Sequence, residues 1–204
     1  MTTQHTLLAL GDSLTEGYGL PLEHALPAVL ERKLRSGGFA VSVINMGLSG
    51  DTTSGGLRRL RSWLRANPGT TLAGCMVELG ANDQMSGIPL AEAEANLNTM
   101  LHTLAQAHVP ALLIGWKSII WDDLVPYGEP CFHVTPSDHD PWLQLYERLA
   151  AHHHVPLLPD MLAGVVNVAT HTLPDGLHPS LAGVEVIAGR VYPHAVALLT
   201  QGTR

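Results

Sequence analysis

Residues 6–13 read Thr-Leu-Leu-Ala-Leu-Gly-Asp-Ser, a short apolar run that ends in a glycine and two small polar residues. An apolar run of this length, without polar alternation, is typical of a strand that is buried on both faces of a parallel sheet. Four more runs of this kind follow along the chain: Ala40–Asn45, Leu72–Leu79, Val109–Gly115 and Val155–Leu158. The sequence therefore predicts an α/β fold with a five-stranded parallel sheet.

Longer amphipathic segments separate these runs and predict helices on both faces of the sheet, which makes a three-layer α/β/α arrangement. In the first of them a helical stripe begins at Leu22, and the pair Gly37-Gly38 ends it. Ser180 can cap a last helix, in which Pro193 predicts a kink or a break. The first predicted helix is thus Pro21–Ser36, and those between it and the last are Thr53–Asn67, Pro89–His108 and Pro141–His153.

Composition indicates one compact domain over residues 1–204, with 46% hydrophobic and 14% charged residues. Eleven Lys and Arg against eighteen Asp and Glu leave a net charge of -7, so nucleic acid is an unexpected partner. No apolar run approaches the ~20 residues of a membrane span, so we expect no stable membrane insertion. The oligomeric state does not follow from the sequence.

Two cysteines, Cys75 and Cys131, lack the number and spacing of a disulfide framework or a metal site. No Lys or Arg precedes Arg32, and the apolar piece Leu7–Leu10 is far shorter than the core of a signal peptide. We expect a cytoplasmic protein from the sequence as given. A periplasmic or secreted location stays open if a leader has been removed.

Loops rich in glycine and small polar residues follow the first three strands. In an open parallel sheet, ligands bind at the carboxyl ends of the strands, where such loops meet. A fourth polar block stands just before the last predicted helix. The four blocks are Gly11–Gly17, Asn45–Asp51, Gly80–Asp83 and Asp175–Ser180.

These blocks contain every part that a serine nucleophile needs: a base, a carboxylate that orients the base, and donors for an oxyanion. Ser13 is the candidate nucleophile and His178 the candidate base, with Asp175 three residues before it. The candidate oxyanion donors are the backbone N–H groups of Ser13 and Gly50 and the side-chain amide of Asn82. At Gly50 the missing Cβ lets a substrate oxygen approach the backbone.

The motifs Gly-Asp-Ser-Leu-Thr-x-Gly, Ser-Gly-Asp-Thr, Gly-Ala-Asn-Asp and Asp-Gly-x-His-Pro occur here in this order. Together they resemble the GDSL or SGNH hydrolase superfamily over almost the whole chain, and in particular its small bacterial esterase, thioesterase and lysophospholipase branch. The resemblance implies one SGNH-hydrolase domain, the flavodoxin-like strand order 2-1-3-4-5, and no metal or cofactor. It also assigns the family roles to Ser13, Gly50, Asn82, Asp175 and His178.

Hydrolysis of carboxylic esters through an acyl-serine intermediate is therefore the expected activity, with thioesters and lysophospholipids as further substrates. The same machinery also removes acetyl groups from carbohydrates or other small metabolites in similar proteins, and this alternative stays open. A binding module without activity is disfavoured because the triad is complete. Acyl-chain length and leaving group do not follow from the sequence.

Residues 116–140 break the alternation of strands and helices and carry four of the ten aromatic residues of the chain. A segment of this length without a sustained period is often functional. One hypothesis is a substrate wall or lid in which Trp116, Trp121 and Tyr127 bind the acyl group. The other is a small aromatic core, including Phe132, that holds the loop to the body of the protein.

Twelve histidines raise the question of a metal site. His152, His153 and His154 end a predicted helix, where histidine interacts favourably with the helix dipole and consecutive side chains diverge. In the long loop, His133 and His139 stand near Asp122 and Asp123. Solvated loop residues are the favoured interpretation, and we expect no bound metal.

Overall fold

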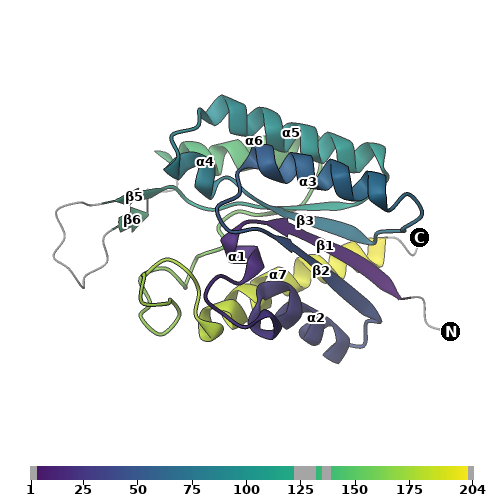
Figure 1. Ribbon diagram of the computed structural model, residues 1–204, viewed down its shortest axis with the longest axis horizontal. Helices are drawn as coiled ribbons and strands as arrows, with labels where there is room; N and C mark the ends of the chain where they lie inside the picture. Colours follow the sequence, from purple (N-terminus) through teal and green to yellow (C-terminus); the bar gives the residue numbers. More distant parts are fainter. Residues whose placement is uncertain (1–3, 122–131, 135–138, 202–204) are drawn as a thin grey trace.

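A computed structural model describes residues 4–121, 132–134 and 139–201 (Figure 1). Five parallel strands form one sheet in the order β2-β1-β3-β4-β7. Both the predicted fold class and the predicted strand order are therefore confirmed. The strands are β1 (His5–Gly11), β2 (Val41–Gly47), β3 (Gly74–Glu78), β4 (Ala111–Ile114) and β7 (Leu157–Leu158).

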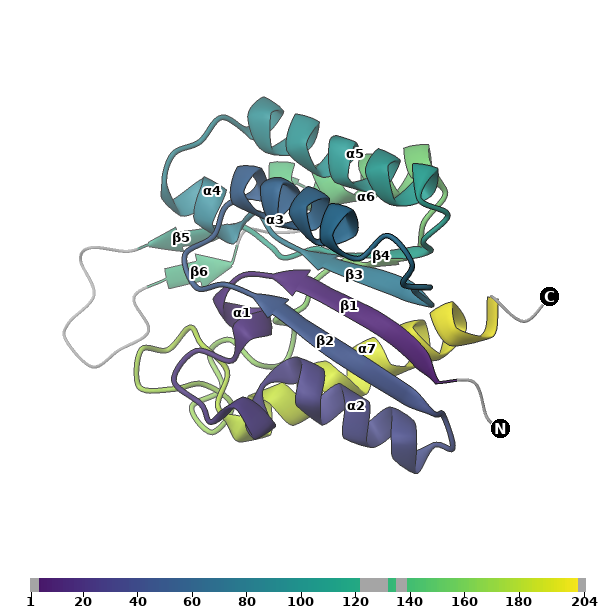
Figure 2. The ribbon, with the colours of Figure 1, turned by 45° about the vertical axis from the view of Figure 1, so that its right-hand side comes forward.

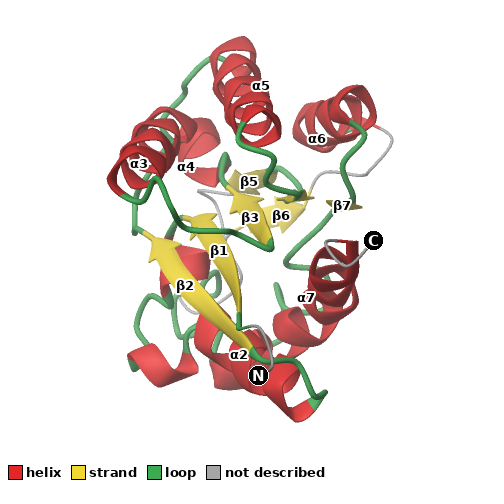
Figure 3. Cartoon of the chain, turned by 90° about the vertical axis from the view of Figure 1, so that its right-hand side faces the viewer, coloured by secondary structure: helices red, strands yellow, loops and turns green. Residues whose placement is uncertain are grey.

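Two layers of helices cover the sheet (Figures 2 and 3). One layer holds α3 (Thr53–Ala66), α5 (Leu90–Gln106) and α6 (Pro141–His153). The other layer holds α2 (Leu26–Ser36) and α7 (Leu181–Gln201). The three-layer arrangement thus agrees with the prediction.

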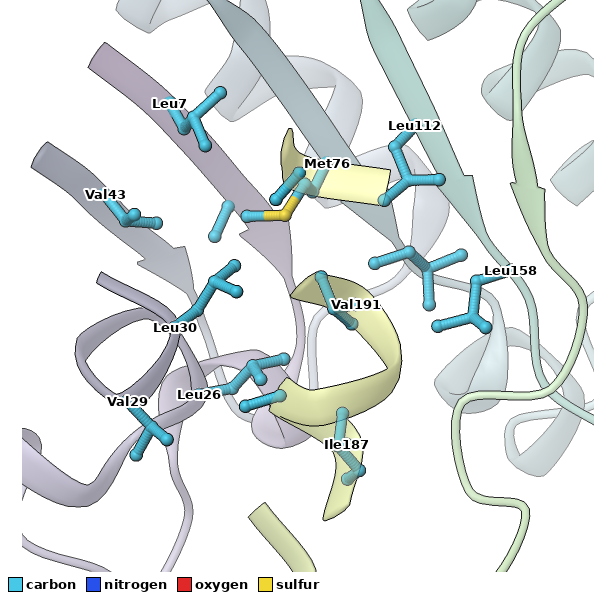
Figure 4. Packing of buried hydrophobic residues seen from close by; sticks show 14 of the residues in the cluster. Leu7, Leu26, Val29, Leu30, Val43, Met76, Leu112, Leu158, Ile187 and Val191 are labelled. Carbon is cyan, nitrogen blue, oxygen red and sulfur yellow. The ribbon is translucent and has the colours of Figure 1, made fainter. Parts of the chain in front are cut away.

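Each layer has its own hydrophobic cluster because neighbouring residues of a strand point to opposite faces. On β1, Leu8 and Leu10 belong to the cluster under α3, α5 and α6, whereas Leu7 and Ala9 belong to the cluster under α2 and α7. Figure 4 shows the second cluster, where Leu30 of α2 gathers with side chains of the sheet and of α7. Burial on both faces explains why the strands are continuous apolar runs.

The carboxyl ends of the strands carry the short elements that build the site. The helix α1 (Ser13–Glu16) follows β1 almost directly, and α4 (Ala81–Met85) follows β3. A hairpin of β5 (Ile119–Trp121) and β6 (Phe132–Val134) projects at the same end (Figure 1). The long segment after β4 therefore contains two short paired strands that its sequence did not predict.

Helix α2 begins at Leu26, so the helix start predicted at Pro21 is wrong. A short 3-10 helix (Leu22–His24) stands in its place, and Leu22 is 75% exposed instead of packed. Pro27, within the first turn of α2, explains the break: a proline ring is tolerated there but clashes with the carbonyl one turn earlier inside a helix.

Helix α7 continues through Pro193, so the predicted break is wrong. Buried side chains flank the proline on both sides, with Val191 before it and Ala195 and Leu198 after it. Packing of both halves against the sheet offsets the cost of about 3 kcal/mol that an interior proline imposes. Ser180 caps this helix as predicted, because its Oγ accepts the N–H of Gly183 at 3.3 Å.

The other predicted bounds agree with the structure to within two residues, and those of α6 agree fully. The last strand is the least regular, since only Leu157 and Leu158 pair with β4. Within the described ranges, no helix has the length and apolar character needed to cross a membrane.

Candidate active site

Ser13 is held at the turn from β1 into α1. Gly11 ends the strand where a Cβ would lie 2.1 Å from Thr15 Oγ1 and 2.6 Å from Glu78 Oε2, so only glycine fits. Asp12 caps the helix, because its Oδ1 accepts the N–H of Leu14 at 3.0 Å. The nucleophile candidate is thus the first helical residue, in a backbone turn with little freedom.

Asp175 and His178 form a compact local unit before α7. One carboxylate oxygen of Asp175 accepts the N–H groups of Leu177 and His178, each at 2.9 Å. The other oxygen accepts Nδ1–H of His178 at 2.8 Å. Partial burial raises the pKa of the Asp175 carboxyl, but these hydrogen bonds outweigh it, so the net pKa is lowered. The carboxylate is therefore charged and fixed against the imidazole.

The imidazole joins this unit to Ser13. Because Nδ1 must carry the proton that it donates to a carboxylate, the neutral ring presents Nε2 as an acceptor. The hydroxyl of Ser13 lies 3.0 Å from this Nε2. Carboxylate, imidazole and hydroxyl therefore stand in the order that serine hydrolases use for acyl transfer.

Tyr18 is a site residue that the sequence analysis missed. Its ring stacks on the His178 imidazole with the centroids 4.3 Å apart and the planes 33° apart. The residue is 50% exposed and lines the cavity beside Ser13, so its ring is accessible to a ligand there. An aromatic residue immediately after the first glycine-rich block was the available signal.

Two backbone N–H groups are free to meet an oxyanion. Those of Ser13 and Gly50 have no acceptor within the described part of the chain. Gly50 has a φ of 77°, while a Cβ built there meets nothing within 4 Å. The left-handed backbone conformation is therefore one reason for glycine at this position, and the expectation that a Cβ would obstruct an approaching substrate oxygen stays a prediction.

The loop that carries Gly50 is tied down on both sides. On one side, Glu16 accepts the N–H of Ser49 at 2.8 Å and also its hydroxyl. On the other side, Asp51 pairs with Arg59, whose Nε lies 2.6 Å from Asp51 Oδ2. The position of the Gly50 N–H is thus set by two charged contacts.

Arg59 also joins this loop to the ends of β1 and β2. Its guanidinium donates to the carbonyl of Gly11 at 2.9 Å and to the carbonyl of Met46. The planar fork of arginine can serve several acceptors at once, which a lysine ammonium cannot reproduce in the same geometry. Arg59 belongs to the basic cluster Arg58-Arg59-Leu60-Arg61 that the sequence shows, but its partners come from distant strands.

Asn82 lies at the start of α4, opposite Ser13, and lines the same cavity. Its Nδ2 donates to Asp12 Oδ2 at 3.0 Å and to the carbonyl of Asp51 at 2.9 Å. Both amide hydrogens therefore have acceptors. An oxyanion at this place must share one of these hydrogens or displace an acceptor.

Two buried carboxyl groups underlie the site. Asp12 is 1% exposed and Glu78 is 5% exposed, and Glu78 Oε2 accepts the Thr15 hydroxyl at 2.8 Å. Burial, with the negative charges of Asp51 and Asp83, raises the pKa of Asp12 to about 7. Burial and the neighbouring Asp12 likewise raise the pKa of Glu78 well above its usual range.

Asp83 has a supporting role in the same loop. Its carboxylate accepts the backbone N–H of Thr53 at 2.8 Å and the Thr53 hydroxyl at 2.6 Å. The side chain is fully buried and does not line the cavity. Asp83 thus fastens α4 to the start of α3.

A cavity of about 400 Å³ opens beside Ser13 and His178. Trp116 forms part of its wall and is 4% exposed, with its ring 6.5 Å from that of Trp142 in an edge contact. The side chain of Trp121 and all of Tyr127 lie outside the described residues. The apolar wall of the cavity consists of Leu14, Tyr18, Ala81, Met85, Trp116, Leu162 and Leu177.

The candidate metal ligands of the long loop cannot be placed together. Asp122, Asp123 and the side chain of His133 lie outside the described residues, and His139 is exposed. In the helix-ending triplet, His153 Nε2 lies 2.7 Å from Asn98 Oδ1. Among the residues that the structure describes, no three His, Cys, Asp or Glu side chains converge on one point.

Known proteins are similar to this chain in sequence and in fold. Residues 9–186 match the GDSL-like Lipase/Acylhydrolase family. An arylesterase of Vibrio mimicus is 35% identical over 173 residues, which cover 85% of this chain and 79% of that protein. Thioesterase 1/protease 1/lysophospholipase L1 of Escherichia coli K12 is 32% identical over 177 residues, 86% of this chain and 76% of that protein.

Among solved structures, the crystal structure of TesA superposes with a TM-score of 0.80 and 30% sequence identity, over 96% of this chain and 100% of that one. The family match covers far more than half of the chain, and it includes the candidate triad. The chain therefore belongs to the GDSL-like lipase/acylhydrolase family.

Proposed function

We propose that this protein hydrolyses carboxylic esters through an acyl-serine intermediate at Ser13. The observation that supports the proposal is the continuous chain of hydrogen bonds from Asp175 through His178 to the Ser13 hydroxyl, at 2.8 Å and 3.0 Å. This chain ends beside an apolar cavity that can hold an acyl group.

Acylation begins when Ser13 Oγ attacks the carbonyl carbon of the ester and its proton passes to His178 Nε2. The electron pair of the carbonyl double bond moves to oxygen, and the N–H groups of Ser13 and Gly50 are the donors for this oxyanion. When the carbonyl reforms, the bond to the leaving alcohol breaks and His178 returns the proton to the alkoxide. The acyl group then stays on Ser13.

Deacylation repeats these steps with water. Water gives a proton to His178 and its oxygen attacks the acyl carbon, after which the bond to Ser13 Oγ breaks and the serine regains its proton. Asp175 holds the imidazole with Nδ1 protonated and stabilises the imidazolium that forms in both halves. Because the pKa of Asp175 is lowered, it stays a carboxylate throughout.

The cavity favours esters with an apolar acyl or aryl group. Beyond the catalytic and oxyanion residues, leucine, methionine and aromatic side chains make up most of the rest of the wall and form a surface on which an apolar group can pack. This composition supports an acyl-ester substrate over the alternative of an acetylated carbohydrate. The thioesterase and lysophospholipase names of the relative suggest two further leaving groups for testing.

Two experiments test the proposal. Ser13→Ala should abolish turnover of acyl esters and labelling by a phosphonate, because the nucleophile is gone while the fold is kept. Ser86→Ala, on the exposed end of α4, is the matched control and should keep both. Turnover near that of the unaltered protein in pure Ser13→Ala would refute the proposal.

Substrate choice needs a panel of aryl esters with acyl chains from acetyl to palmitoyl, one acetylated sugar and one acyl thioester. We expect kcat/KM to rise from acetyl to medium chains, because each buried methylene contributes about 0.8 kcal/mol. A preference for the acetylated sugar would instead support the carbohydrate alternative.

A further inference from the structure

The orientation of the Asn82 amide is decided by its neighbours. An amide has an oxygen that accepts and a nitrogen that donates, and rotation by about 180° exchanges them. Nδ2 meets two acceptors, Asp12 Oδ2 at 3.0 Å and the carbonyl of Asp51 at 2.9 Å. The opposite orientation would bring the amide oxygen against a carboxylate and a carbonyl, which is unfavourable.

Asp12 is well suited to decide this orientation. Its two oxygens have separate tasks: Oδ1 accepts the N–H of Leu14 at 3.0 Å, and Oδ2 accepts Nδ2 of Asn82. The side chain is 1% exposed, so solvent cannot replace either contact. The same residue therefore begins the helix of Ser13 and contacts Asn82 across the site.

We propose that Asp12 is a positioning residue that holds the Asn82 amide with its nitrogen toward the oxyanion site of Ser13. This inference rests on the proposed function and on the sequence-based assignment of Asn82 as a further oxyanion donor, which requires the oxyanion to share or displace the hydrogen bond from Asn82 Nδ2 to the carbonyl of Asp51. Asp12 is assigned a positioning role because its Oδ2 accepts the Asn82 amide nitrogen and its Oδ1 accepts the N–H of Leu14. Its effect on catalysis passes through Asn82.

Asp12→Asn tests this directly. Asparagine is as good a helix cap as aspartate, so its Oδ1 can still accept the N–H of Leu14. Its Nδ2 then faces the Nδ2 of Asn82, and two donors oppose each other. The Asn82 amide must rotate or move, which places its oxygen where an oxyanion should bind.

The measurement is a double-mutant cycle on kcat with a medium-chain aryl ester. Asn82→Ala should lower kcat by about 10² to 10³, as removal of an oxyanion donor does. We expect Asp12→Asn to lower kcat by about tenfold or more with a smaller change in KM. In the Asn82→Ala background, the same substitution should change kcat by less than about twofold.

Two controls separate positioning from structural damage. Asp12→Ser keeps a residue that can cap the helix, but the serine side chain is too short to reach Asn82. It should therefore lower kcat when Asn82 is present and have little effect in the Asn82→Ala background. Asp83→Asn alters an equally buried aspartate beside Asn82, whose carboxylate accepts the backbone N–H and the hydroxyl of Thr53. Its effect should be the same with and without Asn82.

The outcomes divide cleanly. If Asp12→Asn lowers kcat as strongly in the Asn82→Ala background as in the unaltered protein, the positioning role is overturned. A kcat of Asp12→Asn equal to that of the unaltered protein also overturns it. Both results leave the proposed function intact. If Asn82→Ala itself keeps kcat, Asn82 is not an oxyanion donor, and the positioning role falls with that assignment while Ser13 labelling still tests the hydrolase itself.

Discussion

Asp12 should make the stability of this protein fall as the pH rises from about 5 to 8. Burial is the main cause that raises its pKa from 3.8 to about 7, and the charges of Asp51 and Asp83 add to it. The native state therefore holds this proton more tightly than the unfolded chain. The resulting stabilisation is complete below the unfolded pKa and is lost as the pH passes the native pKa.

The size of the effect follows from the two pKa values. One pKa unit corresponds to about 1.4 kcal/mol, so the proton on Asp12 contributes about 3 kcal/mol at pH 5 and almost nothing at pH 8. Glu78, whose pKa burial also raises, acts in the same direction. His153, whose pKa burial lowers, acts in the opposite direction. His153 is present in an Asp12 variant and cancels in a comparison with it. Glu78 does not cancel fully, because Asp12 helps to raise its pKa, so the substitution also removes part of the Glu78 contribution, which has the same sign.

Asp12→Asn removes this titration. Urea unfolding of both proteins at pH 5, 6, 7 and 8 gives the difference in unfolding free energy, which should shift by about 3 kcal/mol across this range in favour of the unaltered protein at low pH. Glu147→Gln, at an exposed position on α6, is the control and should leave the pH dependence unchanged. A flat difference for Asp12→Asn, or one that favours the unaltered protein as pH rises, would refute the reasoning.

Three other predictions concern the loops and the cavity. Arg59→Lys should lower kcat, measured per active site by phosphonate titration, because lysine cannot bind Asp51 and the Gly11 carbonyl together. Arg58→Lys, at an exposed position, is the control, and a kcat of Arg59→Lys equal to that of the control would contradict this prediction. Trp116→Ala should cost about 3–5 kcal/mol of stability and penalise long acyl chains more than acetyl, whereas equal losses across the acyl series would leave Trp116 a purely structural residue. A chelator should leave ester hydrolysis unchanged, and a loss that added metal restores would revive the histidine site of the long loop.

The fold was largely predictable because burial on both faces leaves a simple signature in each strand. Strand order was not, since an apolar run says nothing about its neighbour; it came from the resemblance, and the pairings confirm it. Errors arose where local rules compete with packing. Pro27 and Pro193 are both prolines in amphipathic segments, yet one delays a helix and the other lies inside one because buried side chains flank it.

The site was predictable as a set of residues and not as a network. Ser13, Gly50, Asn82, Asp175 and His178 stand in recognisable motifs, and the structure brings them to one end of the sheet. Arg59 and Glu78 escaped notice because their significance depends on partners that are distant in sequence. Likewise, the engagement of both amide hydrogens of Asn82 is a matter of three-dimensional contacts that no spacing reveals.

The hydrogen bond between His178 and Ser13 joins residues that are 165 positions apart, whereas His178 and Asp175 are three apart. The hydrogen bond between Asp175 and His178 can therefore form in an isolated turn. The hydrogen bond between His178 and Ser13 forms only after the C-terminal segment has packed against the end of β1, the first strand of the chain. Catalytic activity thus requires, and reports, the association of the two ends of the chain. During refolding, esterase activity should return no earlier than the tryptophan fluorescence of the finished core, so a substrate assay timed against that signal measures the order of assembly.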